Sequence, residues 1–219
     1  MRDMSISLSL IRLNQHMQKL QQKTPPQKQI QKAVHALNEA LDKKGDGTLT
    51  VTPMELFESG AMSRTSFFRY FSTIDSIILF AQAELTEVIS VYNRRKALYL
   101  RLSRRDFFMM LLNTLYSQKE IVKLLIRRPS KRYWQETLVM IKPIIDRTFP
   151  KDEEELFYEL FVLVFVHTLE WWIENGFRKE DIPPCVDRII TLIHILDQSN
   201  LQNIFVVKKL LTSIRLMIK

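Results

Sequence analysis

The stretch from Val51 to Phe71, VTPMELFESGAMSRTSFFRYF, concentrates side chains that suit contact with a nucleic acid. Arginine guanidinium groups donate several hydrogen bonds to phosphates or base edges, and serine and threonine hydroxyls add further donors. Residues 64, 65, 68 and 69 would share one side of a helix, because neighbours on a helical face are three or four positions apart. Together with a lysine near the start of the preceding helix, the expected DNA-contacting residues are Lys28, Thr52, Ser63, Arg64, Thr65, Ser66, Phe68 and Arg69.

Two short helices must position these side chains. Thr52 is a predicted N-cap, and Pro53 suits the first helical position because its missing N–H would have no partner there. Ser63 is the predicted N-cap of the second helix, on which Phe67 and Phe71 lie four residues apart and face the core. A short helix braced by another across a glycine turn suits the major groove of DNA. The alternative is that the arginines only solvate a surface without a partner.

Residue patterns typical of enzymes and metal sites are sparse. The loop DKKGDGTLTVTP imitates a calcium loop, but Lys44 and Pro53 occupy its third and twelfth positions, where oxygen ligands are required. The four histidines lie far apart, and His167 and His194 fall on apolar helices, where we expect core positions. The chain has no G-x-S-x-G motif, no phosphate-binding glycine loop and no zinc-ligand spacing. We therefore expect no enzyme, no catalytic residues, no metal and no cofactor.

The composition indicates a folded, basic protein. The 219 residues are 46% apolar and carry a net charge of +8 at pH 7. The single cysteine, Cys185, excludes an internal disulfide and fits a reducing cytoplasm. The N-terminal apolar run is too short for a signal peptide, and the most apolar stretch, LFYELFVLVFVHTLEWWIE, contains charges that a membrane-spanning helix avoids. We predict a cytoplasmic protein with a buried helix at this stretch and no membrane partner.

The pattern predicts an all-α fold. Only four glycines occur, and no segment alternates polar and apolar residues as a strand would. A hydroxyl residue followed three positions later by an acid predicts helix starts at Ser103 with Asp106 and at Ser117 with Glu120. Glycine and proline residues predict the stops. The expected helices cover residues 5–22, 27–43, 53–59, 64–70, 74–100, 104–116, 118–127, 131–147, 152–175, 182–197 and 201–217.

We expect two domains. Residues 1–73 would form a DNA-binding domain, a three-helix bundle with a helical N-terminal extension, and residues 74–219 a larger helical domain for ligand binding and dimerisation. Aromatic and methionine side chains with a few polar tips usually line a small-molecule pocket, although each of them also suits a plain core. An apolar ligand, or an anion met by Arg104, Arg105 or Lys131, would suit such a pocket. Its candidate lining is Phe107, Phe108, Met110, Leu111, Tyr116, Tyr133, Trp134, Met140, Tyr158 and Phe161.

The segment LTVTPMELFESGAMSRTSFFRYFSTIDSIILFA resembles the DNA-binding segment of TetR-type transcriptional regulators, and the preceding QKQIQKAVHALNEAL resembles the first helix of that family. Further on, HTLEWWIENGFRKEDIPPCVDRIITLI is similar to a C-terminal motif of the family. Thr65 stands where the family has glycine, and Phe68 and Ile74 replace a tyrosine and a lysine that contact phosphates. Tyr70 keeps a phosphate-contacting position, so the resemblance adds it to the expected DNA contacts.

The resemblance implies a homodimeric regulator, more often a repressor, which binds a near-palindromic DNA operator and responds to a small effector. In the family, the helix corresponding to residues 74–100 joins the two domains and swings when the effector binds. The last two helices of the larger domain form a four-helix bundle with the same pair from a second subunit. This implies a dimer interface whose alternative role is an intrachain core, made of Leu169, Trp172, Val186, Ile189, Ile190 and Ile193.

The charge distribution keeps a second function open. Residues 91–147 hold 14 lysines or arginines against 4 acids, whereas residues 1–80 hold 10 against 7. The stronger basic excess therefore lies outside the expected DNA-binding domain. It would flank DNA, meet an anionic effector, or only solvate helix surfaces. The alternative to a regulator is a helical module that binds a protein or a membrane surface and carries a degenerate DNA-binding domain.

Overall fold

Helices are the only regular secondary structure within the residues that the computed structural model describes, so the predicted all-α fold is confirmed. These residues are 25–44, 51–127 apart from 59 and 61, 131–142 and 154–198. The predicted helices at 5–22 and 201–217 lie outside them, as does most of the calcium-like loop. In the described part of the chain, no helix combines the length and apolar character needed to cross a membrane.

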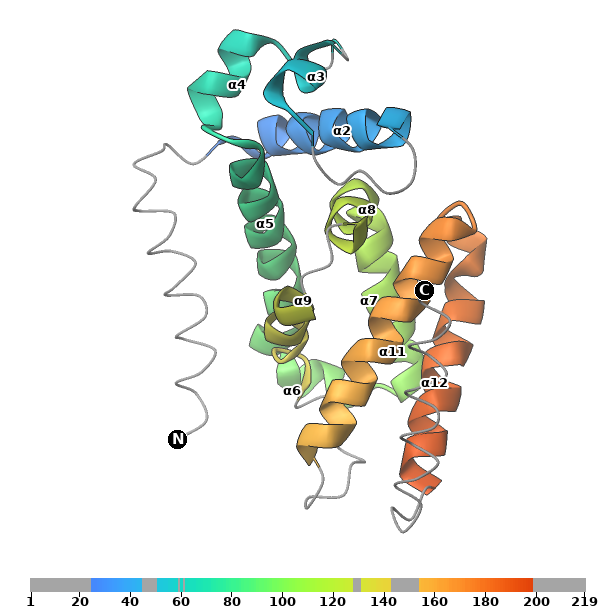
Figure 1. The fold of residues 1–219 in the computed structure, drawn as a ribbon. Helices are drawn as coiled ribbons and strands as arrows, with labels where there is room; N and C mark the ends of the chain where they lie inside the picture. Colours follow the sequence, from blue (N-terminus) through green and yellow to red (C-terminus); the bar gives the residue numbers. More distant parts are fainter. Residues whose placement is uncertain are drawn as a thin grey trace.

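The first three described helices form a unit that we call the head. It consists of α2 (Gln27–Lys44), α3 (Pro53–Glu58) and α4 (Arg64–Tyr70). Figure 1 shows α3 and α4 on one side of α2 and α8 (Lys119–Arg127) on its other side. Gly60, between α3 and α4, has a φ of +73°, a left-handed conformation that glycine adopts without strain.

Side-chain caps begin the two short helices of the head, as predicted. The Glu55 carboxylate accepts from the Thr52 backbone N–H at 2.7 Å and from the Thr52 hydroxyl at 2.9 Å. The Ser63 hydroxyl accepts from the Ser66 backbone N–H at 3.2 Å. These bonds satisfy backbone donors that a helix leaves without partners at its start.

Phenylalanine rings hold the head together and connect it to α5 (Ile74–Arg94). Phe67 of α4 and Phe71, which follows its last residue, are fully buried, and the Phe71 ring lies 5.9 Å from that of Phe80 on α5. The Phe57 ring of α3 meets Phe67 edge to face, with 5.5 Å between centroids. Edge-to-face pairs of this kind add to the gain from burying the apolar surface.

Helix α5 is shorter than predicted. It ends at Arg94 and is followed by the single turn α6 (Lys96–Tyr99), so the expected continuous helix over 74–100 is wrong. The chain turns here so that Tyr99 packs back on Tyr92, whose ring centroid is 4.7 Å away. The Tyr92 hydroxyl also lies 2.6 Å from that of Thr114 on α7 (Arg104–Ser117), which ties the end of α5 to the next helix.

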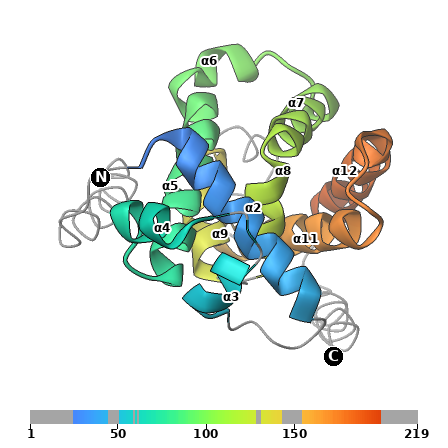
Figure 2. The same ribbon diagram turned by 90° about the horizontal axis from the view of Figure 1, so that it is seen from above.

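Three helices that pack together form a unit that we call the body: α7, α11 (Glu154–Glu174) and α12 (Ile182–Gln198). Helix α12 packs against both α7 and α11, and Figure 2 shows α11 and α12 side by side, across the molecule from α4. The predicted cap of α7 is present, since the Ser103 hydroxyl accepts from the Asp106 backbone N–H at 3.1 Å.

Two predicted boundaries in the larger domain are wrong. Ser117 does not cap α8, because it is the last residue of α7 and its hydroxyl donates to the Thr114 carbonyl at 2.6 Å. Helix α9 (Lys131–Leu138) ends before the predicted 147. After it, the Ile141 N–H bonds to the Leu138 carbonyl three residues back, at 3.0 Å, so the chain tightens out of the α-helical pattern.

The junction between α11 and α12 is anchored by Trp172. Gly176 and Phe177 have φ values of +89° and +51°, which end α11 as the glycine predicted. The Trp172 indole N–H donates to the Arg178 carbonyl at 2.7 Å, and its ring meets that of Phe177 at 4.3 Å. Nearby on α12, Cys185 is fully buried, and burial raises the pKa of its thiol to about 11.

Candidate nucleic-acid interface

The outer face of α4 gathers exposed basic, hydroxyl and aromatic side chains. Arg64, Thr65, Phe68 and Arg69 are exposed, whereas Phe67 between them is completely buried. Phe68 leaves 56% of its surface exposed, which is unusual for a large apolar side chain. The structure therefore brings these four predicted residues together on one surface, and the inner residue Phe67 fixes the orientation of the helix.

The two arginines of this face retain free hydrogen-bond donors. The Arg64 guanidinium lies 5.9 Å from the Phe68 ring centroid, and the Arg69 guanidinium lies 5.4 Å from the Tyr70 ring centroid. A cation held over an aromatic ring keeps its N–H groups available at its edge. Neither arginine forms an ion pair with an acid in the described part of the chain. Both can therefore donate to phosphates or to base edges.

Several predicted DNA-contacting hydroxyls already have partners. The Thr52 hydroxyl donates to Glu55, and the Ser63 hydroxyl caps α4 while lying 2.9 Å from the Ser66 hydroxyl. Their first role is therefore to set the starts of α3 and α4. Tyr70 is half-buried at the end of α4, beside Arg69.

Lys28 does not belong to the α4 face. It is exposed on the first turn of α2 and lines a hollow shared with residues 117–121, at the junction of α7 and α8. Helix α8 lies on the opposite side of α2 from α3 and α4 (Figure 1). The prediction that Lys28 contacts a phosphate rested only on its position near the start of the helix. The packing of α2 on α8 shows which residues are its neighbours.

The predicted effector pocket separates into different environments. Phe107, Phe108, Leu111, Trp134, Met140 and Phe161 are core residues with at most 4% exposure. Met110 is 41% exposed, so it lies at the surface and is not one of these core residues. Tyr116 instead stacks on Trp172 at the α11–α12 junction.

Polar groups nevertheless lie inside this core. The Tyr133 hydroxyl donates to the Gln82 carbonyl at 3.3 Å, and burial raises the pKa of Tyr133 to about 12. The Tyr158 hydroxyl donates to the Gln135 carbonyl. The Trp134 indole N–H is buried and has no hydrogen-bond partner within the described ranges, so a buried acceptor would stabilise it.

The three cations that were predicted to meet an anion in the pocket, Arg104, Arg105 and Lys131, lie in different surroundings or outside the described residues. Arg105 pairs with Asp187 of α12, which raises the pKa of Arg105. Arg104 is half-buried at the start of α7, and the side chain of Lys131 lies outside the described residues. Of these three cations, Arg105 is therefore engaged by α12.

The predicted dimer interface is wrong for five of its six residues. Leu169, Trp172, Val186 and Ile189 have no exposed surface, and Ile193 keeps 2%. A second subunit cannot cover side chains that the same chain already buries. Their stripe faces the interior of the body, where α12 packs on α7 and α11. Ile190 is half-buried, so it alone retains surface.

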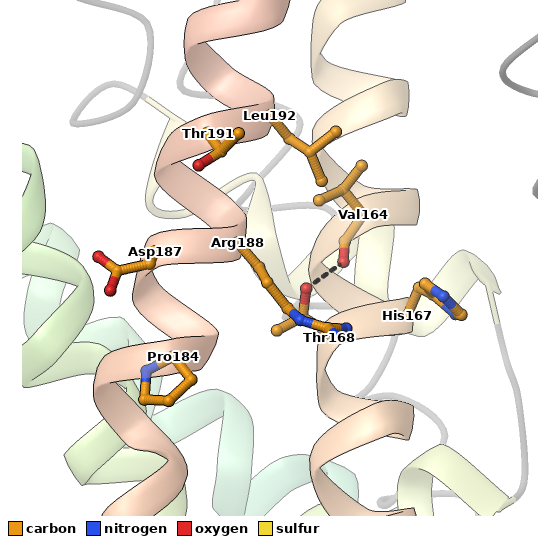
Figure 3. Close-up of a pocket in the computed structure, with 8 residues that line it drawn as sticks. All are labelled: Val164, His167, Thr168, Pro184, Asp187, Arg188, Thr191 and Leu192. Atoms are coloured by element: carbon orange, nitrogen blue, oxygen red, sulfur yellow. Dashed lines mark hydrogen bonds between the residues drawn. The ribbon is translucent and has the colours of Figure 1, made fainter.

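The outer side of α11 and α12 instead carries an open groove (Figure 3). At one end, the Val164 and Leu192 side chains turn toward each other across the groove. Arg188 reaches over the groove toward α11, with its guanidinium 4.0 Å from the Trp171 ring centroid. Apolar and hydroxyl groups dominate the lining, which consists of Val164, His167, Thr168, Pro184, Asp187, Arg188, Thr191 and Leu192.

The predicted core positions of His167 and His194 are wrong. The His167 side chain is 42% exposed, points away from α12 in Figure 3 and lies 3.4 Å from the Glu170 carboxylate. His194 is exposed on α12. Both helices are apolar on average, but each histidine falls on the outer side of its helix.

Among the residues described, no three histidine, cysteine, aspartate or glutamate side chains gather where they could hold a metal ion. Comparisons of the chain with protein-family models, curated proteins and solved structures find no match.

Proposed function

We propose that the protein is a dimeric, TetR-like transcriptional repressor that binds a near-palindromic operator through α3 and α4. The observation that carries this proposal is the outer face of α4. Arg64 and Arg69 lie there without acidic partners in the described chain, beside an aromatic residue that is 56% exposed. A face that only solvated the helix would gain nothing from exposing Phe68, whereas the major groove offers apolar thymine methyl groups to such a ring.

Each side chain of the face has a role in this proposal. Arg64, in the first turn of α4, donates to base edges, for which a bidentate contact to guanine is the commonest form. Arg69 and Tyr70 contact phosphates, which position the helix but do not specify sequence. The α3 caps and the buried Phe67 keep α4 in a fixed orientation while it enters the groove.

Dimerisation is proposed through the outer α11–α12 groove in place of the buried stripe. Leu192 offers half-exposed apolar surface at the groove, and the exposed Thr191 and Arg188 offer polar contacts around it. The same patch from a second copy would meet it in a two-fold arrangement. Two heads spaced by such a dimer would reach successive major-groove turns, roughly 34 to 36 Å apart.

A selection from random duplex DNA tests the DNA part of the proposal. Fragments retained by the protein should share a near-palindromic sequence, and Arg64→Ala should weaken binding to it by about 1 to 3 kcal/mol while relaxing the preference at one base position. Lys179→Ala, which removes an exposed cation outside the head, should leave binding nearly unchanged. If selection enriches no sequence, the chain is better explained as a helical interaction module.

Analytical ultracentrifugation tests the dimer. Leu192→Glu places a charge in the outer groove and should convert the dimer to a monomer, because a buried unpaired charge is strongly unfavourable. Leu98→Glu is the matched control, since Leu98 is 55% exposed on α6 and should tolerate the charge. A parent protein that sediments as a monomer at every concentration would remove this part of the proposal.

A further inference from the structure

A second hollow lies where the head meets the helices below it. It is formed by one face of α2 and by the junction of α7 and α8, and its volume is about 440 Å³. Ligand sites for small molecules fall in this size range. Lys28, Gln31, Lys32 and His35 follow each other along the α2 side of the hollow, at the three- and four-residue spacing of a helical face.

Three lysines converge on this hollow from two parts of the chain. Lys28 and Lys32 come from α2, and Lys119 is the first residue of α8. All three are exposed, and none pairs with an acid within the described residues. Three ammonium groups around one hollow repel each other, so the arrangement favours an anion between them.

At the other end of the contact between α2 and α8, the cations of α8 are neutralised by an acid. There the Asp42 carboxylate accepts from Lys123 at 3.0 Å and also pairs with Arg127. The cations of α8 are thus paired at its C-terminal end and unpaired at its N-terminal end. A surface that only needed solubility would not require this difference.

The start of α8 adds hydrogen-bond donors. Its first backbone bond joins the Val122 N–H to the Gln118 carbonyl, and earlier amides of a helix have no carbonyl partner within it. These amides and the helix dipole attract anions at this end. Lys119 opposes the dipole at the same position, so a lysine here is unfavourable for the helix and favourable for an anion bound in front of it.

One acid, Glu120, lines the hollow, and its carboxylate is already hydrogen-bonded. The Glu120 carboxylate accepts from the Asn38 side-chain amide at 3.1 Å and lies 3.8 Å from His35. The Asn38 amide also donates to the Glu120 backbone carbonyl at 2.9 Å. Glu120 is therefore turned toward the middle of α2, and it does not neutralise the lysines.

We propose that this hollow binds a small phosphorylated anion through Lys28, Lys32, Lys119 and the first turn of α8. Operator DNA is the less suitable ligand, because α8 lies on the opposite side of α2 from α4 (Figure 1). Binding itself is independent of the proposed function. If that function holds, an anion that ties α2 to α8 alters DNA affinity to the extent that it favours one orientation of the head.

Inorganic pyrophosphate is the probe, titrated into the full-length protein by calorimetry at constant ionic strength. It should bind saturably, and the double variant Lys32→Gln/Lys119→Gln should weaken binding about tenfold, equivalent to about 1.4 kcal/mol. The control Lys43→Gln/Lys179→Gln removes the same charge from exposed positions outside the hollow and should change the affinity less than about twofold. All four positions are exposed, so both variants should stay folded, which thermal unfolding checks.

Three outcomes would overturn the proposal. The first is the absence of saturable pyrophosphate binding by the parent protein. The second is an equal loss in both double variants, which would show attraction to net charge alone. The third is a duplex-DNA titration in which Lys32→Gln/Lys119→Gln loses DNA affinity but keeps pyrophosphate affinity, which would assign the lysines to the DNA backbone. Failure of the operator selection would leave the pyrophosphate result unaffected.

Discussion

The head and the body are stabilised by different means. In the head, α3 and α4 have only 6 and 7 residues, and they depend on side-chain caps and on a few phenylalanines. In the body, α11 and α12 have 21 and 17 residues and bury continuous apolar faces against each other and α7. Helices shorter than about 12 residues are marginal alone. Single contacts therefore matter more to the head, which also presents the candidate DNA-binding face.

Within the head, the residues that orient α4 differ from the residues that α4 exposes to solvent. Phe67 is buried and Phe68 is exposed, although they are adjacent in the sequence. A substitution at Phe68 therefore tests binding without much effect on folding. In α12 the predicted interface residues Val186, Ile189 and Ile193 belong to the core, so substitutions there would change stability as well as any dimerisation.

Among substitutions in the head, Phe67→Ala should lower the free energy of unfolding most. Removing a buried phenylalanine leaves a cavity among Phe57, Phe71 and the inner face of α4, and should cost about 3 to 5 kcal/mol of unfolding free energy. Phe68→Ala should cost less than about 1 kcal/mol. Urea unfolding followed by circular dichroism measures both. Equal effects would show that the two rings contribute alike to stability, contrary to their burial.

A smaller effect is expected from the cap of α4. Ser63→Ala removes the acceptor for the Ser66 backbone N–H and should cost about 0.5 to 2 kcal/mol. Ser72→Ala is the control, because Ser72 is exposed and makes no hydrogen bond within the described residues. Amide hydrogen exchange in α4 should increase in the first variant only. Unchanged exchange in Ser63→Ala would mean that the phenylalanines alone hold the helix.

The smallest effect concerns the ion pairs that join the head to α8. Burial alone would raise the pKa of Asp42, but hydrogen bonds from Lys123 and Arg127 lower it below its ordinary value. The stabilisation is therefore present above the unfolded pKa, about 3.9, and is lost as the pH falls through the folded pKa. Because Asp42 is 46% exposed, Asp42→Asn should cost only about 0.5 to 1 kcal/mol near pH 7.

The pH dependence makes this prediction specific. The difference in unfolding free energy between the parent and Asp42→Asn should shrink below the unfolded pKa of about 3.9 and disappear once the pH lies below the folded pKa of Asp42, and it should also shrink in high salt at neutral pH. A difference that persists in acid would mean that the amide disturbs packing rather than charge.

Local patterns in the sequence predicted most of the fold because caps, stops and helical periodicity act over a few residues. The bounds of α4 and the caps at Thr52 and Ser63 are confirmed. The apolar stripe of α12 was equally clear, but periodicity shows only that a face is covered and not which surface covers it. The hollow at Lys28 and Lys119 joins residues far apart in the chain, and no local pattern could bring them together.

The burial of Cys185 makes its thiol a probe of how often the body opens. It is the only cysteine, and its thiol has no exposed surface and a pKa of about 11. Because the thiolate is the reacting species, a water-soluble alkylating reagent at pH 8 can modify the native protein only when α12 opens. The alkylation rate therefore measures how often the body opens. A variant that loosens only the head, such as Ser63→Ala, should leave that rate unchanged.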